Sequence, residues 1–386
     1  MLIIRIFFYD TYACRSFAGF SGISASFTGD TSLANGLPTA TCTAVYANDP
    51  ANDYKVSSYL YTLMGYDREG RVTQQVETTA LAGSKLITNT TYTRQGRPSL
   101  TDISLHTTDS VYNVQLLPDY DATGSLIHES SIVNSAYSPS KAQPASAISG
   151  NQAVVTYSYD TLGRLSKKQL NSGQSIDYAY NLRGQLTGLT HPAFAQTLYY
   201  ETGTKPCYNG NISSIKFKPD GVSGVTRVYT YDPLNRLTAC TSTDGYNTSY
   251  KYNLNSSPLT IKRYGLISDG SVGLVDDLQL TYGGNRVLSV WDAAASVILE
   301  SSLDFDAGNG DALYGYDADG RMTSDTGRGI TSISYAPNDR PVHTEMDEAT
   351  FDYLYSADGR KLKSKAVTGF RKLKGLEPFA DELADA

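Results

Sequence analysis

The sequence predicts an all-β fold of antiparallel β-hairpin repeats that form a curved sheet, and three observations support this prediction. The chain has 386 residues and contains 30 Tyr, against 11 Phe and one Trp, together with 33 Gly. Tyrosine favours strands in which its ring is half buried while its hydroxyl reaches water. Aromatic and β-branched residues alternate with the period of two that marks one face of a strand. A hexapeptide that begins with tyrosine also recurs along most of the chain, as expected for a repeat protein.

The overall charge and the cysteines exclude several protein classes. The formal net charge is −7, and this charge repels phosphate backbones, so nucleic acid is not expected as a partner. No apolar stretch approaches the ~20 residues of a membrane-spanning helix, so no membrane span is expected. The cysteines lack Cys-x-x-Cys spacing, which argues against a zinc ribbon and a thioredoxin-like site. Buried or idle thiols are expected, with a disulfide left open if the chain is exported. These cysteines are Cys14, Cys42, Cys207 and Cys240.

Residues 1–60 are predicted to be a strand-rich segment with only weak repeats. The opening sequence MLIIRIFFYDTYAC is interrupted by Arg5 and continues into Tyr9 and Asp10 without a small-residue cleavage site. These features argue against a signal peptide, so we interpret the segment as a β-strand. No export signal is therefore expected on this chain. A protein that acts outside the cell would carry its signal upstream of Met1.

Two blocks, residues 61–133 and 153–365, carry the hexapeptide repeat. The pattern Tyr-x-x-x-Gly-Arg begins at Tyr66, Tyr92, Tyr159, Tyr316 and Tyr355. Looser copies begin at Tyr120, Tyr180, Tyr231, Tyr252, Tyr282 and Tyr335. The copies at Tyr159 and Tyr180 are 21 residues apart, which is the length of two strands of about five to seven residues plus a turn. Each unit is therefore predicted to be one β-hairpin.

The hexapeptide has the chemistry of a tight turn. Val155, Tyr157 and Tyr159 alternate before it, which places these side chains on one face of a strand. Asp160 can accept a hydrogen bond from the backbone two residues on, and Gly163 tolerates a positive φ. A catalytic role for the repeated aspartates is the alternative interpretation. Acid–base chemistry needs a partner group and a pocket, and neither recurs beside these aspartates. We therefore predict that the repeat has a structural role in forming the turn. The arginine that follows is a candidate partner of the aspartate.

We assign no residue to catalysis, to a cofactor or to a metal, and no cofactor is expected. The residues assigned to the structural repeat motif are Tyr66, Asp67, Gly70, Arg71, Tyr92, Gly96, Arg97, Tyr159, Asp160, Gly163, Arg164, Tyr180, Gly184, Tyr231, Asp232, Asn235, Arg236, Tyr316, Asp317, Gly320, Arg321, Tyr335, Arg340, Tyr355, Gly359 and Arg360.

Other candidate sites are weaker. The segment DFDAGNGD at residues 304–311 is rich in oxygen ligands but fails the spacing of an EF-hand, so a solvated loop is expected. The histidines lack metal-ligand spacing, and no nucleophile elbow or phosphate-binding loop is present. Strand or loop histidines are therefore expected at His106, His128, His191 and His343.

Two segments interrupt the repeats. Residues 134–152 are rich in Ser, Ala and Pro, which predicts an exposed loop or a linker between the two blocks. Residues 366–386 form a C-terminal tail, in which LEPFADELADA is a candidate for a short helix or a solvated end.

The segments YDTLGRL, YDPLNRLT and YDADGRMT resemble the YD repeats of the RHS family. Its members include large surface and secreted bacterial proteins, polymorphic toxins and the cocoon components of insecticidal toxin complexes. The resemblance covers about residues 60–365, and the N-terminal segments resemble RHS-type proteins of Bacteroidetes-like bacteria. It implies a β-sheet ribbon that spirals into a hollow shell able to enclose a C-terminal toxic polypeptide. It also implies a secreted or cell-surface location, and as partner either the remainder of a longer RHS polypeptide or an enclosed toxin.

The sequence departs from toxin-bearing relatives in one respect. Their repeats end in a core with a DPxGxxG-like signature, where an aspartate-dependent self-cleavage frees the cargo. This chain has no such segment and no recognisable toxin domain, so self-cleavage is not expected of it. We also expect 386 residues to close only part of a shell and to leave an open sheet edge.

Three function classes follow from these observations. The first is a non-catalytic structural and interaction protein, a section of a β-shell from a protein of the polymorphic-toxin or intercellular-competition type. The second is a carbohydrate-binding module that stacks exposed tyrosine faces on cell-surface glycans. The third is a glycosidase-like enzyme, which needs two carboxylates facing across a cleft. Carboxylates on turns do not establish that geometry, so we expect no enzyme.

Overall fold

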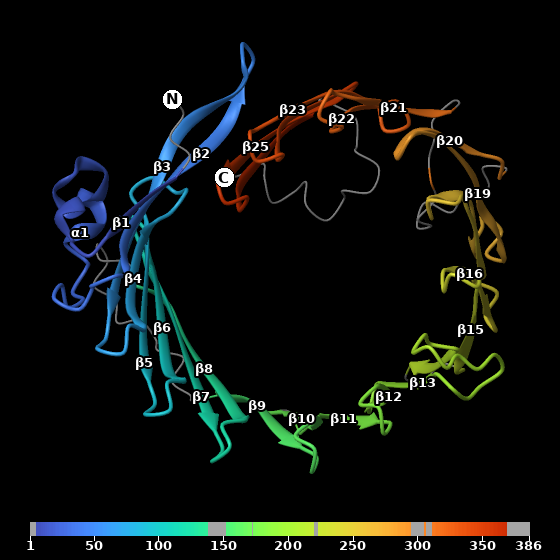
Figure 1. Ribbon diagram of the computed structural model, residues 1–386, viewed down its shortest axis with the longest axis horizontal. Helices are drawn as coiled ribbons and strands as arrows, with labels where there is room; N and C mark the ends of the chain where they lie inside the picture. The colour runs from blue at the N-terminus through green and yellow to red at the C-terminus, as the bar shows by residue number, and fades with distance from the viewer. Residues whose placement is uncertain are drawn as a thin grey trace.

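The structure is a computed structural model that describes residues 5–137, 152–171, 173–219, 223–294, 305 and 311–368. It confirms the all-β prediction. Within these ranges a single 26-stranded sheet curls into a ring (Figure 1). The helical elements of the described chain are one-turn pieces near the N-terminus, namely η1 (Ala13–Ser16), η2 (Ala18–Phe20) and α1 (Ser21–Ser24). None of them is long and apolar enough to cross a membrane.

The strands follow the chain order around the ring. They are β1 (Arg5–Tyr9), β2 (Pro38–Asp49), β3 (Asp53–Tyr66), β4 (Val72–Thr78), β5 (Lys85–Tyr92), β6 (Pro98–His106), β7 (Val111–Tyr120), β8 (Leu126–Tyr137), β9 (Gln152–Tyr159), β10 (Leu165–Leu170), β11 (Ser175–Tyr180), β12 (Leu186–His191), β13 (Phe194–Tyr199), β14 (Ser214–Pro219), β15 (Val225–Tyr231), β16 (Leu237–Ser242), β17 (Thr248–Tyr252), β18 (Pro258–Leu266), β19 (Val272–Gly283), β20 (Arg286–Asp292), β21 (Ala312–Tyr316), β22 (Met322–Asp325), β23 (Ile330–Tyr335), β24 (Pro341–Met346), β25 (Ala349–Ser356) and β26 (Lys361–Thr368).

Each strand pairs antiparallel with the next, so the sheet is a series of hairpins. The register shifts by one residue where a strand ends in a motif tyrosine, for example at Tyr159, Tyr231 and Tyr316. A β-bulge bends its strand and increases the local twist. Because the bulge recurs beside the same kind of turn, it contributes to the steady curvature of the sheet.

The two ends of the repeat series meet, which corrects the expectation of a sheet that stays open. One edge of β2 pairs with β3, and its other edge pairs first with β1 and then with β25. At this seam Val45 lies opposite Ser356, Tyr46 lies opposite Tyr355, and the Ala357 N–H donates to the Ala44 carbonyl at 2.8 Å. The length of the chain favours a partial shell, but strands of four to fourteen residues, each paired with the next, complete the ring. Among the described strands, only β1 and β26 keep one unpaired side.

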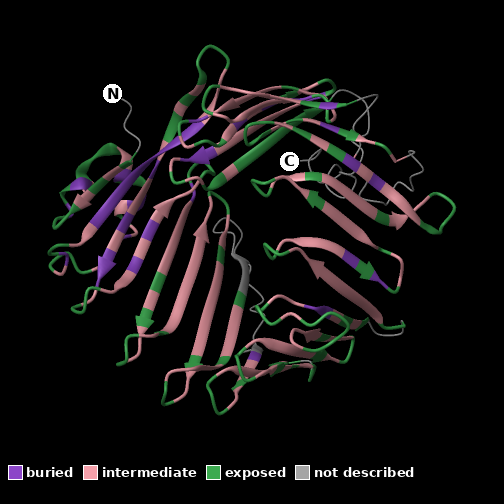
Figure 2. Cartoon of the chain, turned by 45° about the vertical axis from the view of Figure 1, so that its right-hand side comes forward, coloured by how far each residue is buried: buried purple, intermediate pink, exposed green. Residues whose placement is uncertain are grey.

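A small apolar core holds the seam together. Ala44, Tyr46, Ala336 and Val342 are fully buried there. The Asn48 side chain also donates to the Asp352 carboxylate across the seam. Figure 2 shows that buried residues concentrate near β2 to β4, while most of the remaining wall is only half buried. This is the expected burial of a wall that is one sheet thick.

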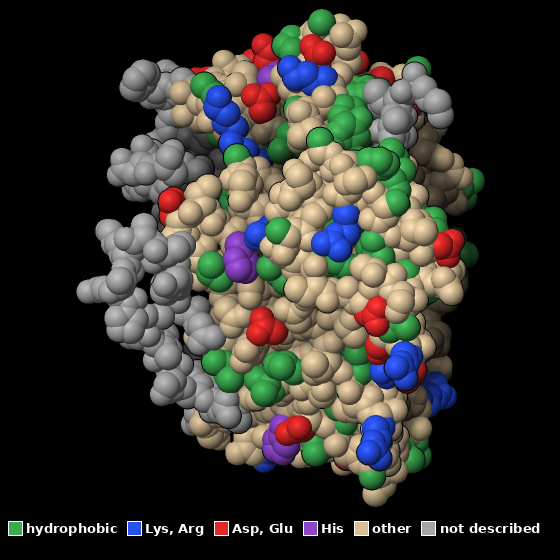
Figure 3. Space-filling view, turned by 90° about the vertical axis from the view of Figure 1, so that its left-hand side faces the viewer, with side chains coloured by type: hydrophobic (Ala, Val, Ile, Leu, Met, Phe, Trp, Pro, Cys, Tyr) green, Lys and Arg blue, Asp and Glu red, His purple; other side chains and the backbone are tan. Residues whose placement is uncertain are grey.

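The inner and outer faces of the ring can be told apart. Helix α1 lies outside the ring (Figure 1), and its Ile23 packs in one cluster with Leu63, Val76 and Ile87, which therefore point outward. Neighbours along a strand point to opposite faces, so Thr88 points to the interior. The registers place the following residues on that same inner face: Ile103, Val114 and Val133. The outer face on this side carries scattered charges of both signs and few hydrophobic side chains (Figure 3).

Candidate functional site

The repeat turn is the best-defined constellation in the molecule, and the copy at Asp160 shows its geometry. One carboxylate oxygen of Asp160 accepts the N–H of Leu162 and the N–H of Arg164, both at 2.9 Å. The other oxygen accepts the Nε–H of Arg164 at 2.7 Å. Gly163 has a φ of +75°, in the left-handed region where a side chain is strained. The aspartate therefore has the local turn partners that the sequence predicted.

The same turn recurs with only small changes. The carboxylate accepts from the arginine Nε at 2.6 Å in the Asp67–Arg71 and Asp232–Arg236 pairs and at 2.7 Å in the Asp317–Arg321 pair. A neutral version occurs at Asn181, whose side-chain amide donates to Gln185 at 2.7 Å. The left-handed position is held by the following residues: Gly70, Gly96, Gly184, Asn235, Gly320 and Gly359.

Most of the motif arginines also contact the next repeat. The Arg164 guanidinium lies 4.8 Å from the centre of the Tyr180 ring and donates to the Asn181 carbonyl at 3.0 Å. Arg236 contacts Tyr252 at the same 4.8 Å. Further stacks have carbon-to-ring distances between 4.7 and 5.5 Å; they are Arg71 on Tyr92, Arg97 on Tyr120 and Arg321 on Tyr335. A cation over an aromatic face is attractive, so each turn is tied to its successor.

Most of the motif tyrosines contact the preceding repeat through their hydroxyl groups. The Tyr180 hydroxyl donates to the Leu165 carbonyl at 3.0 Å, and Leu165 is the first residue after the preceding turn. The equivalent bonds, between 2.6 and 2.8 Å, are Tyr66 to Pro38, Tyr92 to Val72, Tyr159 to Leu126, Tyr231 to Ile212, Tyr252 to Leu237 and Tyr335 to Met322. Neighbouring turns are therefore clamped in both directions.

The last copy of the motif lies at the seam. Ser356 takes the place of the aspartate, and its hydroxyl donates to the Asp358 carboxylate. The Arg360 guanidinium is 3.8 Å from the Glu77 carboxylate on β4. Arg340 lies beside Gly359, and the Arg286 guanidinium lies 5.7 Å from the centre of the Tyr316 ring. The contact between Arg360 and Glu77 links the end of the repeat series to its beginning.

The structure does not gather the other sequence candidates into a site. The histidines lie on β6, β8, β12 and β24, and the Nδ1–H of His343 donates to the Asp352 carboxylate at 2.8 Å. No cluster of three or more potential metal ligands occurs within the described ranges. All four cysteines are free, and burial raises the pKa of the Cys42 thiol. Of the segment 304–311, only Phe305 and Asp311 lie within the described residues. Most of the linker 134–152 and of the tail 366–386 lies outside them.

Sequence reasoning missed the contacts between repeats. It assigned the arginine to its own turn, whereas the guanidinium also covers the next tyrosine. The signal was available, because Arg164 precedes Tyr180 by 16 residues and Arg236 precedes Tyr252 by the same 16 residues. A cation and an aromatic residue at the same separation across two hairpins predict a cross-strand contact in both.

The turn carboxylates predict an acid-sensitive fold. The backbone N–H of Arg164 lowers the pKa of Asp160 below its ordinary value of 3.8, and Arg236 does the same for Asp232. A lowered pKa in the folded state stabilises the protein above the ordinary pKa, and this stabilisation is lost as the pH falls through the folded-state value. We therefore expect the urea concentration at the midpoint of unfolding to decrease once the pH falls below about 4.

A matched variant isolates the contribution of these two carboxylates. Asparagine already serves in the turn at Asn181, where its oxygen accepts the N–H groups of Arg183 and Gln185. The double variant Asp160→Asn and Asp232→Asn should therefore fold and show a weaker loss of stability between about pH 5 and about pH 2, the range in which aspartate side chains titrate. An unchanged acid profile in this variant would contradict the assignment.

Comparisons with known proteins agree with the repeat. Residues 159–193 match the family model described as RHS Repeat. No curated protein matches the chain in sequence.

Several solved structures align with most of the chain. They include a crystal structure of TcdB2-TccC3-TEV (16% identity, 86% of this chain, 18% of that chain, TM-score 0.40). The Tc holotoxin pore of Photorhabdus luminescens with a mutated TccC3 aligns at 15% identity over 86% of this chain and 18% of that chain, with a TM-score of 0.40. A crystal structure of TcdB2-TccC3 aligns at 12% identity over 94% of this chain and 22% of that chain, also with a TM-score of 0.40. The chain thus spans about a fifth of the length of those chains.

The family match and the hydrogen-bonded turn fall on the same residues. The matched stretch begins at Tyr159 and contains the turns at Asp160 and Asn181. The chain therefore carries an RHS repeat at residues 159–193, within a longer series of turns that share its geometry.

Proposed function

We propose that this chain is a non-catalytic section of a hollow β-shell that encloses a second polypeptide segment. The shell would belong to a secreted or cell-surface bacterial protein of the polymorphic-toxin or intercellular-competition type. The single observation that carries the proposal is a closed ring whose inner face displays uncovered apolar side chains. Tyr112, opposite Leu105, and Val133, opposite Val114, are on that face and are 48% and 53% exposed.

The uncovered inner face needs an occupant. Apolar surface in contact with water costs roughly 25 cal/mol per Å², so an apolar face inside a closed wall favours a polypeptide that covers it. Because the uncovered apolar side chains lie on the inner face of a closed ring, a segment inside the ring can cover them and a partner on the outer face cannot. The enclosed segment could come from a longer chain of which this is a section, or from a separate cargo protein.

The polar groups of the repeat support a structural role. In the turn at Asp160, the carboxylate holds two backbone N–H groups and an arginine, and that arginine holds the next turn. Within the turn these groups bind the backbone, one another and the next turn, as expected of polar groups that stabilise a structure. Motif tyrosines such as Tyr180 already carry an arginine over the ring, so stacking of these rings on glycans is not favoured. Glycan binding stays a prediction for tyrosines outside the motif.

A disulfide across the seam tests whether the ring is closed in solution. Val45 and Ser356 are register partners, and antiparallel partners have Cα atoms about 4.5–5.5 Å apart, within disulfide range. We expect the double variant Val45→Cys and Ser356→Cys to form an intramolecular disulfide under mild oxidation. Mass spectrometry of the linked peptides would identify it.

The single variants provide the controls for this experiment. Val45→Cys alone and Ser356→Cys alone should not give the linked peptides, even though the four native cysteines remain. If the double variant gives only disulfide-linked dimers or stays reduced, the sheet is open in solution and the proposal of an enclosing shell fails.

A further inference from the structure

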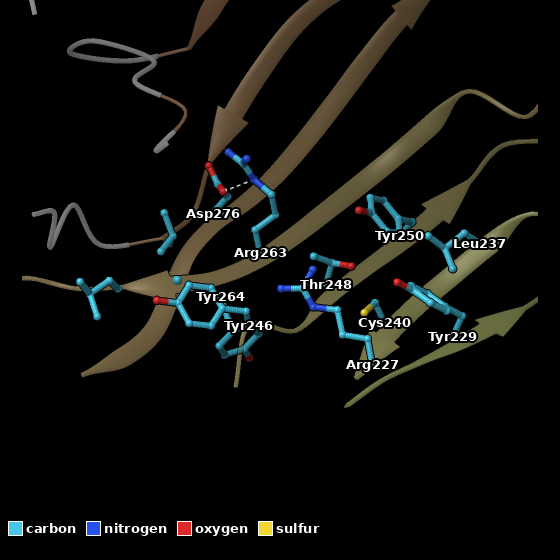
Figure 4. A pocket seen from close by; sticks show the side chains of 13 residues that line it. Arg227, Tyr229, Leu237, Cys240, Tyr246, Thr248, Tyr250, Arg263, Tyr264 and Asp276 are labelled. Carbon is cyan, nitrogen blue, oxygen red and sulfur yellow. Dashed lines mark hydrogen bonds and ion pairs between the residues drawn. The ribbon is translucent and has the colours of Figure 1, made fainter. Parts of the chain in front are cut away.

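A pocket of about 580 Å³ lies on strands β15 to β19, outside the repeat turns (Figure 4). Its lining combines two arginines and an aspartate with aromatic rings, a hydroxyl and a thiol. The residues used in the argument are Arg227, Tyr229, Cys240, Thr248, Tyr250 and Arg263. This size is in the range of sites that bind small molecules or single side chains.

The pocket faces the interior of the ring. Val114 is on the inner face, and directly opposed residues of paired strands share a face. The registers carry that face onward through Glu129, Tyr157, Tyr178, Leu189, Phe217 and Arg227. The cross-strand row then continues from Tyr229 to Cys240 and Thr248. The pocket therefore opens to the space in which an enclosed polypeptide would lie.

Arg227 is an unmatched charge in this pocket. Its Nε is buried and has no hydrogen-bond partner, and no carboxylate within 4 Å pairs with it among the described residues. The guanidinium lies 5.0 Å from the centre of the Phe217 ring. In Figure 4 the side chain extends toward Thr248 and Cys240. A buried donor of a charged group without a partner is costly, so it points to an acceptor that binds there.

The nearby carboxylates are already engaged. Asp276 is fully buried, accepts the Nε–H of Arg263 at 2.5 Å and accepts the backbone N–H of Phe305 at 2.9 Å. Asp244 accepts the Ser242 hydroxyl and the N–H of Tyr246. Neither carboxylate is bonded to Arg227, so no anion of the described residues is paired with this guanidinium.

We propose that this pocket binds a carboxylate joined to an aromatic or apolar body. The planar guanidinium of Arg227 would hold the carboxylate through its N–H donors, as arginine does in charge-assisted pairs. Tyr229 and Tyr250 would contact the apolar body, and the Thr248 hydroxyl is placed to add a hydrogen bond. The inference rests on the proposed function, because the favoured source of the ligand is an acidic side chain of the enclosed polypeptide.

Titration of the full chain with small probes tests the inference. N-acetylphenylalanine offers a free carboxylate beside an aromatic ring, and N-acetylphenylalaninamide is the same molecule without the charge. The capped dipeptide acetyl-Phe-Glu-amide offers the carboxylate only as a side chain. We expect the two carboxylates to bind by calorimetry about tenfold or more tightly than the amide. Tighter binding of the dipeptide favours a polypeptide source, and tighter binding of the free acid favours a small metabolite.

Variants of Arg227 test whether its guanidinium is responsible for the preference for a carboxylate over an amide. Arg227→Met keeps the apolar stem and should abolish the preference for carboxylate over amide. Arg227→Lys keeps the charge without the planar donors and should give an intermediate preference. Arg68→Met removes an exposed arginine of a repeat turn on another part of the ring and is the matched control.

The outcomes separate this inference from the proposed function. No saturable carboxylate binding, or an equal affinity for carboxylate and amide, overturns the inference. A retained preference in Arg227→Met also overturns it. If the seam disulfide forms while carboxylate does not bind, only this inference fails. If the seam disulfide does not form, the enclosing shell fails, whatever the pocket binds.

Discussion

Replacing Tyr46 by alanine is expected to lower the free energy of unfolding by about 3–5 kcal/mol and to open the seam. Among the described residues Tyr46 is the largest fully buried side chain, and it packs with Ala44, Ala336 and Val342. Its ring also meets Tyr54 edge to face, with 5.7 Å between the ring centres. A cavity at this position would remove most of the apolar contact between the first and last repeats. Urea denaturation gives the free energy, and the yield of the seam disulfide reports the opening.

Tyr46→Phe is the control for this prediction. The Tyr46 hydroxyl is buried and has no partner within the described structure. Removing a buried hydroxyl that makes no hydrogen bond should be neutral or slightly stabilising, while the ring contacts remain. If phenylalanine costs as much as alanine, the hydroxyl holds the seam rather than the ring. If alanine costs less than about 1 kcal/mol, the seam contributes little to the fold.

The turn could be predicted from the sequence because its contacts are local. Asp160 meets its hydrogen-bond donors within four residues, at Leu162 and Arg164. Gly163 needs a positive φ for the same local reason. Alternation of Val155, Tyr157 and Tyr159 likewise predicts the shared face, because the period of a strand is fixed. Local chemistry of this kind repeats wherever the hexapeptide repeats.

The seam and the pocket could not be predicted, because their contacts are distant in the sequence. Asn48 and Asp352 are 304 residues apart and meet only because the bulges set the curvature of the whole sheet. The bulge recurs beside the local turn, but closure of the ring depends on the curvature summed over all the strands, which no single repeat specifies, so the expectation of an open sheet was wrong. The pocket has the same origin. In the sequence Arg227 does not differ from other arginines on strands. Only the fold shows that Asp276 and Asp244 accept hydrogen bonds from other donors.

Gly320→Val tests whether the repeat turn is a folding element or a recognition site. Gly320 has a φ of +87°, where a β-branched residue is strained. A side chain would also meet the Arg286 guanidinium at 2.8 Å, and this arginine lies over Tyr316. We expect Gly320→Val to cost about 1–3 kcal/mol of unfolding free energy. Gly163→Val is the matched control, because Gly163 has a similar φ of +75° but open space around it. Gly163→Val should lose only the free energy that backbone strain accounts for, so its loss of unfolding free energy should be smaller than that of Gly320→Val.

Hydrogen exchange shows which backbone amides lose protection in the variant, whereas urea denaturation gives only the total change in the free energy of unfolding. Outside the seam between β2 and β25, each repeat contacts mainly its neighbours, so faster exchange in Gly320→Val should centre on residues 310–330 and spread to adjacent hairpins. Asp317→Ala, which removes the carboxylate held by Arg321, should change the same amides by a smaller amount. These turns bind their neighbours through Arg321 on Tyr335, so the effect should extend toward β23. If Gly320→Val leaves exchange and stability unchanged but abolishes binding to a ligand, the turn is a recognition site, and the structural role assigned to the repeat is wrong.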